Sequence, residues 1–109
     1  MIDARIVLTT VGVLHKAEEI ARELVERRLA ACVNIVGPIR SIYRWQEKVE
    51  NEQEFLLVIK TSAGRAGELE SAFAELHPYE LPERVELSNL GGSVDYLAWV
   101  AEQTAPTNQ

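Results

Sequence analysis

The fold is decided by the stretch Arg28-Leu29-Ala30-Ala31-Cys32-Val33-Asn34-Ile35-Val36, where one kind of element ends and another begins almost without a linker. Before it, apolar residues from Leu14 to Leu29 fall on one face, which predicts a helix of about four to five turns. Within it, residues 32–36 form a short apolar run that is typical of a strand. A helix that leads at once into a strand indicates a helix packed on a sheet.

The neighbouring segments extend this sheet. Residues 5–11 form a β-branched run that predicts a buried strand, ended by Gly12. After Gly37-Pro38 an alternating pattern resumes over 39–49, so the two pieces are predicted to be one long strand bent at this dipeptide. The run 54–61 has a continuous apolar middle, which predicts a strand buried on both faces.

The remainder of the chain predicts a second helix, a fourth strand and a short terminal helix. An apolar stripe from Ala66 to Leu76 predicts the second helix. Thr61-Ser62 precede it and are expected to provide its N-cap. His77-Pro78 ends it, because a residue before proline is pushed out of the α region. Residues 84–90 alternate as a strand, and a last helix over 94–102 follows a serine cap.

The predicted order is β-α-β-β-α-β with a terminal helix, the split arrangement called ferredoxin-like. The expected fold class is therefore α+β, with a bent, long second strand and a short C-terminal helix. We expect a single domain over 1–104 and a frayed tail over 105–109. This fold hosts many functions and by itself settles none.

Charge excludes some classes of partner. The chain has 109 residues, with 11 basic and 17 acidic side chains and a net charge of −6. This sign opposes binding to nucleic-acid phosphates, for which Lys and Arg supply most of the affinity. No apolar stretch reaches the ~20 residues of a membrane span, and the N-terminus lacks the pattern of a signal peptide. We therefore expect a cytoplasmic protein with no nucleic-acid or membrane partner.

His77 is the strongest candidate metal ligand among the residues themselves, because imidazole and carboxylate together suit zinc or copper(II). Glu80 and Glu83 follow it closely, and Pro78 and Pro82 would make the turn rigid. The alternative is a histidine that binds the last carbonyls of its own helix. The two histidines of the chain match no spaced ligand motif, which favours the alternative.

Two other groups have ordinary structural interpretations. Cys32 follows a helix C-terminus and has apolar neighbours, none of which would stabilise a thiolate, so we expect it to pack in the core. The acidic hairpin with Glu47, Glu50, Glu52 and Glu54 is expected to be solvated, with its turn at Glu50-Asn51-Glu52. The weaker alternative is a surface that binds cations with low affinity, because hard cations need six or more oxygen ligands in a cage.

Four aromatic residues, Tyr43, Trp45, Tyr79 and Trp99, combine an apolar body with a polar tip, which suits an interface. Tyr43 and Trp45 share one face of an extended strand and could stack against nucleic-acid bases. The acidic net charge argues against that hypothesis, so packing between subunits is favoured.

Several motifs follow one another along the chain. They are Ala31-Cys32-Val33-Asn34-Ile35, Ser41-Ile42-Tyr43-Arg44-Trp45, Lys60-Thr61, His77-Pro78-Tyr79-Glu80-Leu81-Pro82-Glu83 and Tyr96-Leu97-Ala98-Trp99. In this order and at these spacings, the set resembles the CutA family of divalent-cation tolerance proteins. The likeness runs from about Arg5 to Trp99, which is most of the chain.

The resemblance implies a ferredoxin-like subunit in a tight homotrimer, with long strands meeting edge to edge around the three-fold axis. It implies that Tyr43, Trp45 and their hairpin lie at the interface. It also implies a role in tolerance to divalent metals, copper in particular. Copper(II) or another divalent cation would bind near His77 and Glu80 at a cleft between subunits. No catalytic reaction is implied.

Two positions depart from the family pattern. The position two residues after Trp45 is often glycine in the family and is Glu47 here, which predicts a different turn chemistry. Some members carry a cysteine near the end of the first strand, where this chain has Thr9 and Thr10. His77 is then the ligand carried over from the family, and Glu80 is a local addition.

Other functions stay open. One is a PII-like signalling or scaffold trimer that has no physiological metal and acts on an unidentified protein partner. Another is an acylphosphatase-like hydrolase, which would need an arginine beside an anion-binding loop. Gly12 precedes the first predicted helix, but no arginine adjoins it.

Overall fold

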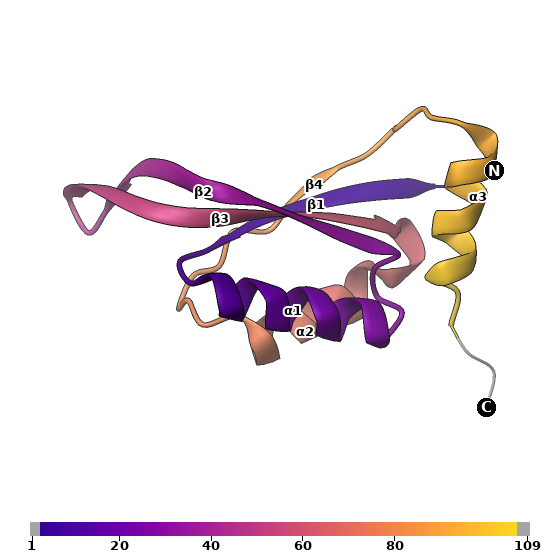
Figure 1. Ribbon diagram of the computed structural model, residues 1–109, viewed down its shortest axis with the longest axis horizontal. Helices are drawn as coiled ribbons and strands as arrows, with labels where there is room; N and C mark the ends of the chain where they lie inside the picture. Colours follow the sequence, from indigo (N-terminus) through magenta and orange to yellow (C-terminus); the bar gives the residue numbers. More distant parts are fainter. Residues whose placement is uncertain (1–2, 107–109) are drawn as a thin grey trace.

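The computed structural model describes residues 3–106 and contains one antiparallel four-stranded sheet in the order β2-β3-β1-β4. Helices α1 and α2 cover one face of the sheet, and α3 lies at one end of it (Figure 1). The elements are β1 (Ala4–Val11), α1 (Leu14–Glu26), β2 (Cys32–Trp45), β3 (Lys48–Ser62), a 3-10 turn (Ala63–Arg65), α2 (Ala66–Leu76), β4 (Val85–Leu87) and α3 (Val94–Gln103). This order is ferredoxin-like and confirms the predicted fold class.

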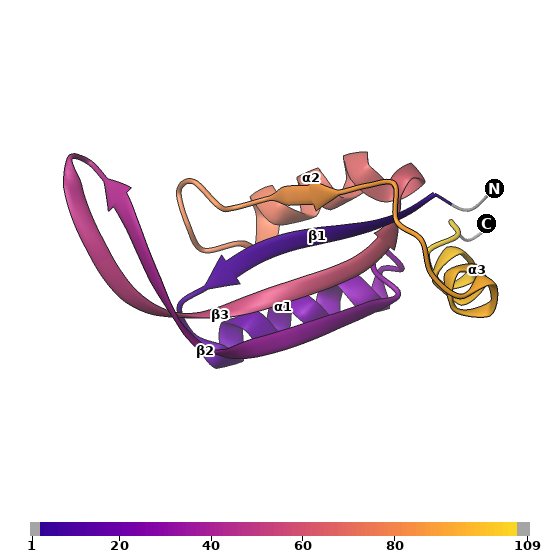
Figure 2. The same ribbon diagram turned by 90° about the horizontal axis from the view of Figure 1, so that it is seen from above.

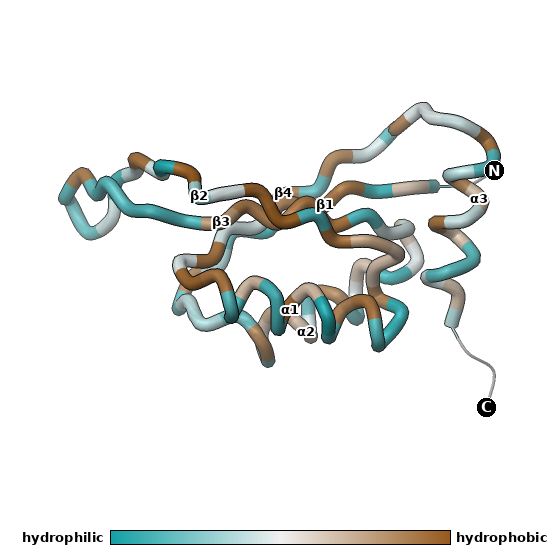
Figure 3. Tube along the Cα trace, in the orientation of Figure 1, coloured by the Kyte–Doolittle hydropathy of each residue, from teal (hydrophilic) through white to brown (hydrophobic). Residues whose placement is uncertain are grey.

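The core lies between the sheet and the two helices. Alternate residues of the central strands point to it, including Val7, Val11, Leu57 and Ile59, none of which is more than 1 % exposed. The helices contribute their apolar stripes: Ala17, Ile20 and Leu24 from α1, and Leu69, Ala72 and Phe73 from α2. Apolar segments accordingly gather along the middle of the sheet (Figure 3). Among residues 3–106, none of the helices combines the length and the hydropathy that a membrane span requires.

The predicted bend in the second strand is confirmed. The register of β2 against β3 breaks between Val36 and Ile39, and the Gly37-Pro38 peptide bond is cis. A Cβ atom on Gly37 would lie 2.6 Å from Cδ1 of Phe55, so the backbone approaches β3 more closely here than a larger residue allows. Beyond the bend, β2 and β3 leave the body of the molecule as a long hairpin arm (Figure 2).

The turn of this arm lies at Gln46-Glu47, so the predicted turn at Glu50-Asn51-Glu52 is wrong. Both turn residues have positive φ, 48° and 66°. A two-residue hairpin turn needs this conformation because it matches the twist of the strands. Glu50 instead pairs with Tyr43 inside the ladder. The sequence concealed the turn because neither turn residue is glycine or asparagine.

Two element ends also differ from prediction. The first helix stops at Glu26 rather than Leu29, because Arg28 takes a φ of 60° and the amides of Leu29 and Ala30 both donate to the Leu24 carbonyl. The last strand has three residues instead of the predicted 84–90, and Asn89 with a φ of 58° turns the chain away from the sheet.

One predicted cap is confirmed and the other is wrong. Ser93 accepts a hydrogen bond from the Tyr96 amide at the start of α3. Thr61 and Ser62 do not cap α2. The Thr61 hydroxyl donates to the Leu29 carbonyl at 2.7 Å, and the Ser62 hydroxyl bonds that of Thr104 at 2.9 Å.

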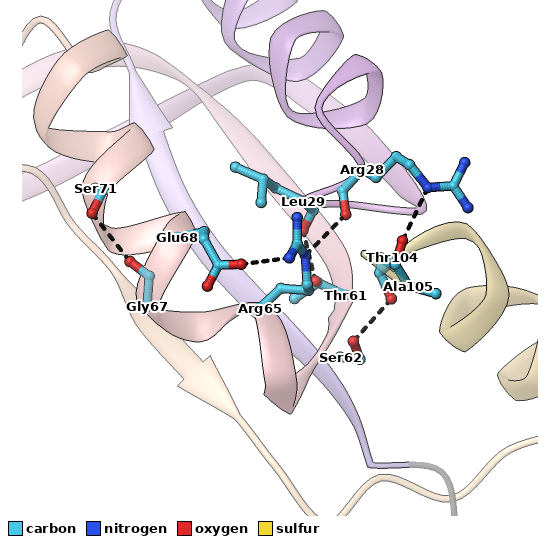
Figure 4. Close-up of polar contacts among 10 residues, drawn as sticks. All are labelled: Arg28, Leu29, Thr61, Ser62, Arg65, Gly67, Glu68, Ser71, Thr104 and Ala105. Carbon is cyan, nitrogen blue, oxygen red and sulfur yellow. Dashed lines mark hydrogen bonds and ion pairs between the residues drawn. The ribbon is translucent and has the colours of Figure 1, made fainter. Parts of the chain in front are cut away.

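Helix α3 is anchored through its C-terminal end (Figure 4). Arg28 donates to the carbonyls of Glu102 at 2.8 Å and Ala105 at 3.1 Å. Arg65, itself paired with Glu68, donates to the Arg28 carbonyl. Of the predicted tail over 105–109, Ala105 is held by Arg28, and residues 107–109 lie outside the described residues.

Candidate functional site

A groove with a volume of about 910 Å³ separates the hairpin arm from the segment that follows α2. One wall comes from β2 and the other from the segment between α2 and β4, while β1 and β3 each contribute one residue. The lining residues are Thr10, Ser41, Ile42, Tyr43, Trp45, Glu54, Pro78, Tyr79, Glu80, Leu81, Pro82 and Glu83. The volume lies in the range of about 300–1,000 Å³ typical of small-molecule sites.

The aromatic side chains of the groove are held by simple features of the backbone. Tyr43 and Trp45 are two residues apart on β2, so both point to the same face of the arm. Tyr79 lies between Pro78 and Pro82, which restrict the conformation of the opposite wall. The three side chains keep 37–42 % of their surface exposed, a large apolar area left open to water.

Glu54 lies at the base of the groove and is only 5 % exposed. It accepts a hydrogen bond of 2.6 Å from the Tyr79 hydroxyl. Burial, followed by this carboxylate, raises the pKa of Tyr79 far above its ordinary value, so the phenol stays protonated and keeps donating. A Cβ atom on Gly12 would lie 3.1 Å from the same hydroxyl, so glycine leaves room for Tyr79 here.

Negative charge dominates the groove. Removal from water, followed by the nearby Glu54 carboxylate, raises the pKa of Glu83. Removal from water also raises the pKa of Tyr43, with smaller contributions from Glu52, Glu54 and Glu50. No lysine or arginine is among the lining residues, all of which lie in the described part of the chain. The groove therefore combines aromatic walls with uncompensated carboxylates.

His77 lies behind the groove and is 9 % exposed. Its Nδ1 accepts the Tyr79 amide at 3.2 Å, so the ring proton is on Nε2, which donates to the Thr10 carbonyl at 3.1 Å. Nε2 is also 3.1 Å from Oγ1 of Thr9. Burial lowers the pKa of His77, and the Thr10 carbonyl and Glu54 oppose this effect. The ring is therefore held in its neutral form.

These contacts correct one interpretation of His77. Its side chain binds β1 at Thr9 and Thr10 rather than the last carbonyls of its own helix. The predicted metal pair of His77 and Glu80 stays a prediction. Glu80 lines the groove, whereas His77 would have to give up the Tyr79 amide or its contacts with β1 to bind a metal. Within residues 3–106, no three His, Cys, Asp or Glu side chains are grouped to hold a metal ion, so the residues as placed do not form a ready metal site.

The other predicted site residues are distributed around the molecule. Trp99 lies on α3, 41 % exposed, with its ring 5.5 Å from that of Tyr96 and outside the groove. The expectation that Cys32 packs in the core is wrong: it is half-buried and is not among the core residues, and its thiol lies 3.8 Å from Oδ1 of Asn34. The prediction of a solvated acidic hairpin is wrong for Glu54, which is 5 % exposed. A carboxylate directly before the apolar run Phe55-Leu56-Leu57 was the available signal.

Comparison with known proteins gives consistent matches. The sequence model of the CutA1 divalent ion tolerance protein matches residues 5–103. A divalent-cation tolerance protein CutA of Thermus thermophilus is 48 % identical over 99 residues, which cover 91 % of this chain and 96 % of that protein. The human protein CutA is 44 % identical over 88 residues, covering 81 % of this chain but only 49 % of the human protein.

Solved structures agree with these sequence matches. The Thermus thermophilus divalent cation tolerance protein superposes with a TM-score of 0.90 at 46 % identity, covering 94 % of this chain and 99 % of that one. The CutA1 structure of Oryza sativa gives a TM-score of 0.92 at 34 % identity and 97 % coverage of both chains.

Proposed function

The chain belongs to the CutA1 divalent ion tolerance family, and on that basis we propose that it acts in tolerance to divalent cations as a homotrimer with a ligand groove at the subunit interface. The observation that carries this proposal is the groove itself. Tyr43, Trp45 and Tyr79 expose large aromatic surfaces around a buried carboxylate, an arrangement that costs stability in an isolated subunit.

Self-association would remove this cost. The chain is small, and the hairpin arm projects from the body with Ile42 68 % exposed and Val49 65 % exposed. Large apolar side chains exposed to this extent on one arm favour association with another protein chain. Three is the subunit number implied by the family resemblance. In the trimer, each groove would lie between the arm and the body of the same subunit. Its open side would face the neighbouring subunit.

Direct binding of copper(II) is a second candidate function. The chemistry of an imidazole near a carboxylate favours it, and His77 and Glu80 are the residues concerned. Against it stand the hydrogen bonds that occupy both ring nitrogens of His77. The geometry therefore supports a response to cations through a ligand in the groove better than direct coordination at His77.

The function is tested by growth under metal stress. Bacterial cells that lack their own family member would be supplied with the wild-type chain, a Trp45→Glu variant or an Arg22→Glu variant, and challenged with copper(II). Arg22 lies exposed on α1 and serves as the control for an added charge. We expect the wild type and Arg22→Glu to restore growth and Trp45→Glu to fail. Equal growth with all three proteins would exclude the groove from the function, and no rescue by the wild type would contradict the tolerance role.

A further inference from the structure

Glu54 is a buried carboxylate without a counter-ion. Among the ion pairs of residues 3–106, none includes this side chain, and its one hydrogen bond comes from the neutral Tyr79 hydroxyl. Taking a carboxylate out of water is unfavourable unless a cation or several hydrogen-bond donors compensate the charge. A single phenol gives only part of that compensation. The charge therefore favours a cation that arrives from outside the subunit.

The walls of the groove select which kind of cation fits. Tyr43, Trp45 and Tyr79 surround the same space as Glu54, and aromatic faces attract organic cations through their π electrons. A bare metal ion instead needs several converging side-chain ligands, which the described residues do not group together. A volume of about 910 Å³ is also far larger than a single ion requires. Aromatic walls over a buried carboxylate suit an ammonium or guanidinium group on a carbon skeleton.

We propose that the groove binds a small organic cation that carries a primary ammonium or guanidinium group, with the Glu54 carboxylate as its counter-ion. The cation donates an N–H to Glu54, and its carbon skeleton lies against Trp45 and Tyr43. Glu80 and Glu83 add negative charge at the walls and raise the local concentration of cations. This inference names the ligand class of the groove and rests on the proposed function only for the groove being the ligand site.

The proposal is tested with n-butylammonium and its uncharged analogue 1-butanol. Each is titrated into 15N-labelled protein while the indole N–H signals of the two tryptophans are followed by NMR. Trp45 reports on the groove, and Trp99 is an internal reference outside it. We expect n-butylammonium to shift the Trp45 signal saturably, 1-butanol to bind at least about tenfold more weakly, and Trp99 to stay in place.

Two variants isolate the carboxylate. Glu54→Gln keeps the shape of the side chain and an oxygen for the Tyr79 hydroxyl, and it should weaken n-butylammonium binding about tenfold or more. Glu18→Gln, on the exposed face of α1, should leave the affinity unchanged. Equal binding of both probes, or an unchanged affinity in Glu54→Gln, would show an apolar groove only and overturn the proposal. So would a wild-type groove that no probe enters, as when a lysine or arginine of a second copy fills it.

The same samples separate this inference from the proposed function. Native mass spectrometry gives their subunit number. A trimer whose groove ignores n-butylammonium overturns the organic-cation proposal and leaves the trimer intact. A monomer that binds the probe through Glu54 supports the ligand class and contradicts the trimer.

Discussion

His77, at the C-terminal end of α2, links this helix to β1 and to the segment after α2 through one imidazole ring. Its Nε2 binds β1 at Thr10, and its Nδ1 holds the Tyr79 amide at the wall of the groove. The arrangement requires a neutral ring. A protonated Nδ1 would carry an N–H group and could no longer accept the hydrogen bond from the Tyr79 amide. The position of the groove wall therefore depends on the protonation of a buried histidine.

This dependence predicts a loss of stability in mild acid. Above pH of about 6.5, the histidine is neutral in both the folded and the unfolded chain. Because the folded pKa of His77 is lowered, the unfolded chain takes up a proton first as the pH falls, and stability falls with it. The slope contributed by one proton is at most about 1.4 kcal/mol per pH unit.

The measurement is urea unfolding at several pH values between 7.5 and 5. His77→Asn should flatten the pH dependence below 6.5, whereas His15→Asn, at an exposed position on α1, should keep the wild-type slope. Slopes rather than absolute stabilities are compared, because His77→Asn also loses packing. A His77→Asn slope identical to that of the wild type would contradict the neutral, buried ring.

At the residue scale, sequence identified His77 as notable but not its partners. Thr9 and Thr10 lie 68 and 67 positions away from His77, and only the folded sheet brings them together. The sequence does not reveal the burial of Glu54 for a similar reason. Its burial depends on Tyr79, which is 25 positions further along the chain. Contacts between distant segments leave no local periodicity to find.

At the scale of elements, local patterns were far more informative. The apolar stripes located both long helices, and Gly37-Pro38 located the bend in β2. The sequence does not predict the turn at Gln46-Glu47, because glutamine and glutamate are poor turn formers. Both residues nevertheless adopt positive φ here. The one indication of an unusual turn in the sequence is Glu47, which stands where the family often has glycine.

The turn gives a direct prediction for stability. Replacing Gln46-Glu47 by Asn-Gly should raise the free energy of unfolding by about 1 kcal/mol, because these residues adopt positive φ with less strain. The check is urea unfolding together with amide hydrogen exchange along the arm. Glu50→Gly is the matched control. It lies in the ladder opposite Tyr43 and should destabilise the arm. An Asn-Gly variant less stable than the wild type would contradict the assigned turn.

At the scale of the whole molecule, one subunit leaves many large apolar side chains exposed to water. The sheet is covered by α1 and α2 on one face, and the arm extends beyond the body (Figures 1 and 2). Three aromatic residues, Tyr43, Trp45 and Tyr79, line an open groove that also contains carboxylates. Sequence patterns could indicate an interface through Tyr43 and Trp45. They could not indicate the groove, which exists only where the arm bends toward the segment after α2.

We propose that this subunit works as a trimer built around its grooves, and native mass spectrometry of the chelator-stripped protein tests that proposal most directly. We expect a single species of three chains at micromolar concentration, and dissociation toward monomers when Trp45→Glu places a charge in the aromatic wall. A wild-type protein that remains monomeric under the same conditions would contradict the account.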